Sequence, residues 1–201
     1  MELADVENGV ARVGGQWRTP SYLMAYVRSA DVLVSHGKAT NTLDDIGIPA
    51  FYLQRHALEL LVKRLISWVY QYADAKGNTT NPDKTQRDRL KNSHRISLLL
   101  EDLHINCRHH GFNEPPECLR VLVDEVESYE SSSATWARYE SSKSKKQEII
   151  HHLDNEVAIP IVVLQEKLEM TVAKLIIGFD GVDAYEDELY HAWADATEMN
   201  V

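Results

Sequence analysis

A histidine that follows two arginines is the strongest candidate for chemistry in this chain. Four residues separate Arg89 from His94, and six separate Arg87 from it. Near neutral pH an imidazole donates or accepts a proton, and a guanidinium can hold a phosphate through two hydrogen bonds. The pattern suits phosphodiester chemistry, with His94 as general acid or base and Arg89 or Arg87 stabilising phosphate charge.

The surrounding segment is basic, although the chain as a whole is acidic. Residues 83–95 contain Lys84, Arg87, Arg89, Lys91 and Arg95 against Asp83 and Asp88, whereas the formal net charge of the chain is −10. A solvated loop explains this island as simply as a phosphate contact does. The overall charge argues against a general nucleic-acid coat protein, so any RNA contact is expected to be local.

A second constellation lies on a predicted helix. His56, Glu59 and Lys63 are three and four residues apart and share one face, and Arg55 is spaced to pair with Glu59. A solvated face with modest ion pairs is one interpretation. The many leucines around these residues favour another, in which they pair with one another or face a cleft or a subunit interface.

Other chemistries find no support. Gly37-Lys38-Ala39-Thr40 has no glycine five residues earlier, as a phosphate-binding loop requires. The pairs His109-His110 and His151-His152 are adjacent, so their side chains diverge on a helix or a strand. We therefore predict no metal site and no cofactor.

Length and composition are typical of one globular domain. The chain has 201 residues, of which 44% are hydrophobic and 26% charged. Its two cysteines form no framework, which indicates a reducing compartment. There is neither a signal-like start nor an apolar run of about 18 residues, so we expect a cytoplasmic protein with no membrane partner.

The apolar spacing predicts an all-α fold: a bundle of four to five core helices and an acidic C-terminal helix. Residues 1–18 are predicted to form a polar lead-in, residues 19–178 the bundle, and residues 179–201 the acidic helix and tail. The first helix should start at Thr19-Pro20 and the second at Pro49. A small β-hairpin is predicted within 149–161, around Asp154-Asn155.

Three segments, taken in order, resemble the HEPN superfamily of helical proteins. The run 51–63 (FYLQRHALELLVK) is similar to the family's second helix, and Ser93-His94-Arg95-Ile96 to the start of its next helix. Arg138-Tyr139 looks like an element ahead of the last core helix. Together these segments span about residues 21–177.

The resemblance implies an up-and-down bundle, commonly a homodimer, with RNA-directed roles in toxin and defence systems. The partners implied are RNA, an antitoxin or a nucleotidyltransferase. Active members are metal-independent endoribonucleases with an Arg and a His four to six residues apart. In many of them this pair lies later, near the position of Arg138, where no histidine follows within six residues.

Three functions therefore stay open. The first is RNA cleavage at His94. The second is a non-catalytic binding or regulatory module that uses a groove formed by His56, Glu59, Lys63, Arg138 and Tyr139. The third is a scaffold that binds another protein through the acidic C-terminal helix. In a dimer, Glu59 and Lys63 are predicted near the two-fold axis.

Overall fold

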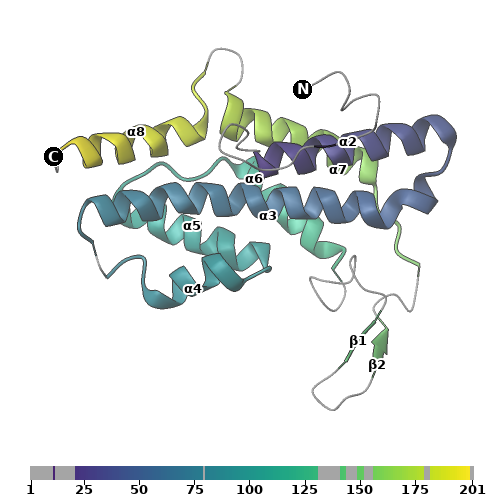
Figure 1. Ribbon diagram of the computed structural model, residues 1–201, viewed down its shortest axis with the longest axis horizontal. Coiled ribbons are helices and arrows are strands. Elements are labelled where there is room, and N and C mark those ends of the chain that lie inside the picture. The colour runs from purple at the N-terminus through teal and green to yellow at the C-terminus, as the bar shows by residue number, and fades with distance from the viewer. Residues whose placement is uncertain are drawn as a thin grey trace.

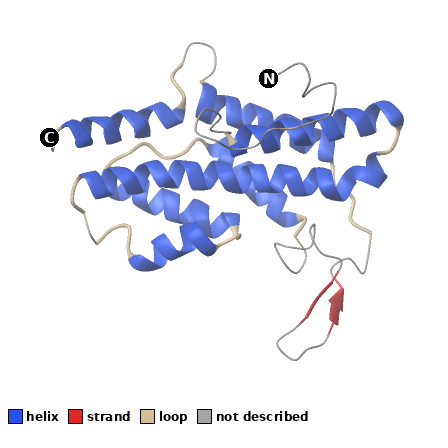
Figure 2. Ribbon diagram, viewed as in Figure 1, coloured by secondary structure: helices blue, strands red, loops and turns tan. Residues whose placement is uncertain are grey.

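In the computed structural model the chain is built almost entirely from helices (Figure 1, Figure 2). The structure describes residues 11, 21–78, 80–130, 141–143, 149–151, 156–178 and 182–199. The elements in chain order are α2 (Tyr22–Thr40), α3 (Leu43–Ala75), α4 (Lys84–Asn92), α5 (Ile96–His110), α6 (Glu117–Ser128), β1 (Ser141–Lys143), β2 (Ile149–His151), α7 (Ile161–Val172), η1 (Ala173–Ile177) and α8 (Tyr185–Glu198). The prediction of an all-α fold is confirmed.

The long helix α3 is the centre of the molecule. It contacts α2, α5, α7 and α8, while α6 bridges α5 and α7 (Figure 1). Its apolar residues recur on several faces, and Leu58, Leu61 and Leu65 are fully buried. A helix with apolar residues on most of its circumference needs neighbours around it, and these four supply them.

The starts of the first two helices differ from the sequence prediction. Ser21 caps α2 by accepting a hydrogen bond from the Met24 amide, so the helix starts at Tyr22; Thr19-Pro20 lie outside the described residues. Pro49 lies inside α3 instead of opening it, because the helix already begins at Leu43. Pro49 is the seventh residue of α3, beyond the first turn, so its missing amide removes one helical hydrogen bond near the start of a 33-residue helix.

The hairpin prediction for residues 149–161 is wrong in its pairing. Ile149–His151 pairs antiparallel with Ser141–Lys143, which precedes it, and residues 156–160 form no strand. Pro160 is the N-cap of α7, and Ile161 shares the buried face of that helix with Leu164 and Leu168. The spacing of three and four residues from Ile161 to Leu168 is helical, so Ile161 belongs to the helix.

The acidic C-terminal helix is anchored to the core. Arg64 of α3 donates to both carboxylate oxygens of Glu186 at 2.5 and 2.9 Å, and Trp68 Nε1 donates to Oε1 at 2.5 Å. Glu186 is buried as a result. At least one acidic residue of α8 therefore stabilises the fold. This weakens the interpretation of α8 as a surface that only binds another protein.

Substituting Leu61 with alanine should lower the free energy of unfolding by about 2 to 5 kcal/mol, because its side chain is fully buried and leaves a cavity. Chemical denaturation measures this loss. The neighbouring Leu60 is only partly buried, and Leu60→Ala should cost clearly less. Equal losses at the two positions would contradict the packing of α3.

No helix within the described residues is both long and apolar enough to cross a membrane.

Candidate functional site

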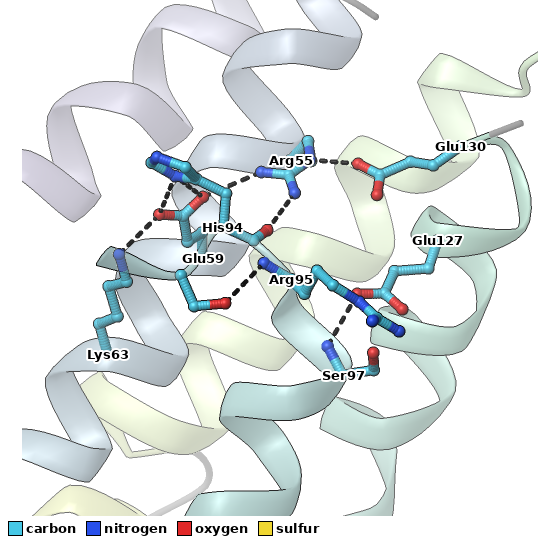
Figure 3. A network of polar contacts seen from close by, with 9 residues as sticks. Arg55, Glu59, Lys63, His94, Arg95, Ser97, Glu127 and Glu130 are labelled. Carbon is cyan, nitrogen blue, oxygen red and sulfur yellow. Dashed lines mark hydrogen bonds and ion pairs between the residues drawn. The ribbon is translucent and has the colours of Figure 1, made fainter. Parts of the chain in front are cut away.

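Two turns of α3, the segment that precedes α5 and Glu130 beyond the end of α6 form a polar cluster (Figure 3). Arg55, Glu59 and Lys63 are spaced four residues apart on α3, and so project from one face. His94 lies in the segment 93–95, which joins α4 to α5. We call Arg55, Glu59, Lys63, His94 and Glu130 the Glu59 network.

Glu59 is the hub of this network. Its carboxylate lies 2.9 Å from Lys63 Nζ, 2.9 Å from Arg55 Nη1, and 3.1 and 3.3 Å from His94 Nδ1. The side chain of Glu59 is only 2% exposed, whereas that of His94 is 47% exposed. A buried carboxylate thus holds one edge of the His94 imidazole (Figure 3), while about half of the His94 side chain is exposed to solvent.

The ionisation of Glu59 is set by two opposing causes. Burial raises the pKa of its carboxyl, but the hydrogen bonds and positive charges of Lys63 and Arg55, together with His94, outweigh burial and bring the pKa below its ordinary value. Glu59 is therefore an anion near neutral pH. An ionised carboxylate only accepts hydrogen bonds, so the proton of the His94 ring lies on Nδ1.

Arg55 links this site to two further parts of the fold. Its guanidinium donates to Glu59, to a carboxylate oxygen of Glu130 beyond the end of α6, and to the backbone carbonyl of His94. The Arg55 side chain is 4% exposed and that of Glu130 is 9% exposed. One buried cation therefore fixes α3, the His94 segment and the end of α6 together.

The ionisation of Glu59 predicts a pH effect. A carboxyl with a lowered folded pKa contributes stability above its unfolded pKa of about 4.5, and that stability is lost as pH falls through the folded pKa. The difference in unfolding free energy between wild type and Glu59→Gln should therefore shrink between pH 7 and pH 3. Denaturation at several pH values measures it, and a difference that is constant with pH would rule out an ionised Glu59.

Control substitution at Glu130 should give the opposite trend. Burial raises the pKa of Glu130 above its ordinary value even though Arg55 opposes this. The folded state then favours the protonated form of Glu130 more than the unfolded state does. The stability that this protonated carboxyl contributes is therefore lost as pH rises. The difference in unfolding free energy between wild type and Glu130→Gln should accordingly be smallest at high pH and largest at low pH.

Arg89 and Arg87, the predicted phosphate ligands, pair with carboxylates. Arg89 donates to both oxygens of Asp102, with Nε 2.7 Å from Oδ2, and Asp102 is 1% exposed. Arg87 donates to both oxygens of Asp74 at 3.2 and 2.5 Å. Both guanidinium forks are thus occupied, and among the described residues His94 makes its polar contacts with Glu59 and Arg55 instead.

The two predicted constellations merge in the structure. Glu59 and Lys63, proposed for binding, join His94, proposed for catalysis, although 35 residues separate Glu59 from His94. His56 contacts two aromatic rings, an edge-on Tyr26 at 4.5 Å and a stacked Tyr52 at 5.8 Å between centroids. Arg138 and Tyr139 lie outside the described residues.

Sequence reasoning did not identify a second polar cluster, between α5 and α6. His104 contacts the Glu114 carboxylate through Nδ1, and Arg120 Nη2 lies 3.0 Å from its Nε2. They adjoin a cavity of about 310 Å³ that Arg108 also lines. The cations here already face carboxylates, Glu114 for Arg108 and Glu117 for Arg120, so this cavity is a weaker candidate for substrate binding.

Within the part of the chain that the structure describes, no three His, Cys, Asp or Glu side chains group as metal ligands would. Comparisons with protein-family models, with curated proteins and with solved structures found no match.

Proposed function

We propose that this chain is a HEPN-like helical-bundle protein that cleaves RNA without a metal, in stress or defence biology, and that His94 and Glu59 form its acid–base pair. The observation that carries the proposal is the hydrogen bonding and the exposure of the His94 side chain. Its Nδ1 is held by a buried anion, and its ring is half exposed. A histidine oriented in this way by a carboxylate is an arrangement that recurs in general acid–base catalysis.

The roles of the individual groups follow from this geometry. With Nδ1 protonated, Nε2 is the basic nitrogen of the neutral ring, and it has no partner among the described residues. It would take the proton of a 2′-hydroxyl as that oxygen attacks the adjacent phosphorus and the bond to the 5′-oxygen breaks, and the departing 5′-oxygen would take a proton from solvent. Glu59 would stabilise the imidazolium that forms, as a carboxylate does beside a catalytic histidine.

The phosphate ligand must differ from those predicted, because Arg89 and Arg87 are paired. Arg95, directly after His94, is exposed, and within the described residues its side chain has no hydrogen bond or ion pair. We assign it as the cation that contacts the phosphate. Lys63 is paired with Glu59 and is not counted as a phosphate ligand. One exposed cation beside His94 makes a local RNA contact compatible with an acidic chain.

A second candidate is a non-catalytic RNA-binding or regulatory module of the same kind. It is favoured by one observation: the two arginines at the expected spacing from His94 are committed to Asp102 and Asp74. In that case the Glu59 network serves chiefly to hold the start of α5, and the exposed Arg95 binds RNA without cleavage.

Incubation of the purified protein with end-labelled RNA in excess chelator separates the two candidates. Attack by the 2′-hydroxyl should yield 2′,3′-cyclic phosphate and 5′-hydroxyl ends, and chelator should not slow the reaction because the proton transfers need no metal. RNA that is bound but uncleaved would select the binding module. RNA that is neither bound nor cleaved would remove both candidates.

A further inference from the structure

Helix α7 and its continuation η1 expose apolar side chains on the face that points away from the core. Val163, Met170 and Ile177 are 44%, 73% and 66% exposed, at intervals of seven residues. The buried side chains of the same helix, such as Leu164, Leu168 and Leu175, lie on the opposite side. A seven-residue spacing returns to nearly the same face of a helix, so the exposed residues form a stripe.

Two unpaired charges flank the centre of this stripe. Glu166 lies four residues before Met170 and Lys174 four residues after it, and both are exposed. Among the described residues neither has a hydrogen bond or ion pair. By contrast, the flanking charges of α7 are satisfied: Lys167 Nζ lies 2.6 Å from Glu125 Oε2, and Glu169 accepts from Gln165 at 2.6 Å.

The order of these residues is self-complementary. When two copies of the stripe meet antiparallel about a two-fold axis at Met170, position 170 + n of one copy faces 170 − n of the other. Glu166 then faces Lys174 of the second copy, and Val163 faces Ile177. A two-fold interface requires such complementarity of one patch with itself. The wider turn of η1 rotates both Lys174 and Ile177 around the helix axis, Lys174 less because it lies nearer the start of η1, so the pairing is closest at Met170 and weakens toward Ile177.

We infer that the chain forms a two-fold dimer through the outward face of α7 and η1, with Met170 on the axis and two Glu166–Lys174 ion pairs beside it. This places the dimer away from Glu59 and Lys63, which the sequence put near the axis. Glu59 is already 2% exposed in a single chain, with its charge neutralised there. The inference is independent of RNA cleavage.

Light scattering tests this interface on the full chain. Wild type should show twice the 22.9 kDa chain mass at micromolar concentration, and Met170→Asp should weaken the dimer at least tenfold in dissociation constant. Met199→Asp is the matched control, since Met199, the residue directly after α8, is 69% exposed and its replacement should leave the mass unchanged. A wild-type protein that stays monomeric would overturn the inference.

Charge exchange identifies the antiparallel pairing itself. Glu166→Lys and Lys174→Glu alone each bring like charges together and should weaken the dimer, whereas the double variant E166K/K174E should restore it. Oxidation of Met170→Cys should also join two chains through position 170, while Met199→Cys should not. A dimer insensitive to all of these changes, or single variants without rescue in the double variant, would assign another face or another occupant to the stripe.

Discussion

Replacing Arg55 with methionine should lower the free energy of unfolding by about 3 to 5 kcal/mol, the typical cost of removing one partner from a buried ion pair. The guanidinium contacts Glu59, Glu130 and the carbonyl of His94, and all three would lose a donor in a site that water barely reaches. Methionine fills a similar volume, so the loss reports the polar contacts rather than a cavity. Urea denaturation at pH 7 measures it.

Arg108→Met provides the matched comparison. Arg108 also pairs with a glutamate, but its side chain is 65% exposed and that of Glu114 is 46% exposed. Exposed pairs contribute about 0 to 1 kcal/mol, so this variant should stay close to wild type. If Arg55→Met were equally mild, the cluster around Glu59 would be open to solvent, and its anion would lose the special environment argued for catalysis.

The helices with strong apolar spacing could be predicted from the sequence. Leu58 and Leu61 belong to the apolar pattern of the run 51–63 and are fully buried, and Gly111 ends α5 with a positive φ of 77°, as a glycine after a helix commonly does. The short helix α4 was missed because it has few apolar residues. The sequence signal for α4 is its capping box, which Asp83 forms with Gln86 three residues later.

The site was only half accessible to sequence reasoning. The residue types at His94, Glu59 and Lys63 were recognised, but they were assigned to two separate hypotheses because spacing along one helix says nothing about a partner 35 residues away. The ion pairs of Arg89 and Arg87 were not predicted for the same reason. Their partners Asp102 and Asp74 are each 13 residues away, on α5 and α3, and only the packing of α4 brings them together.

The partners of Arg55 show most clearly which contacts sequence spacing can predict and which it cannot. Glu59 follows it by one helical turn and was expected, whereas Glu130 is 75 residues away and has no sequence pattern that links it to Arg55. A carboxylate near a buried cation is demanded by electrostatics, yet many carboxylates of this chain could have supplied it.

Replacing His94 with alanine should lower the rate of RNA cleavage by about a hundredfold or more, the range that general acid–base groups contribute. The change removes the Nε2 proton acceptor. It deletes one of three partners of Glu59 but leaves Lys63 and Arg55, and it keeps the backbone carbonyl that Arg55 binds. The melting temperature should therefore move little. Initial rates on labelled RNA in chelator measure the effect.

The most direct test of the proposed chemistry is cleavage rate and melting temperature measured on the same preparations of wild type, His94→Ala and His36→Ala. His36 is exposed on α2, away from the Glu59 network, and its replacement should change neither quantity. If His94 is the acid–base group, its variant loses cleavage and keeps its melting temperature. Unchanged cleavage in His94→Ala, or no cleavage by wild type, would contradict RNA cleavage at His94 and leave the Glu59 network a structural one.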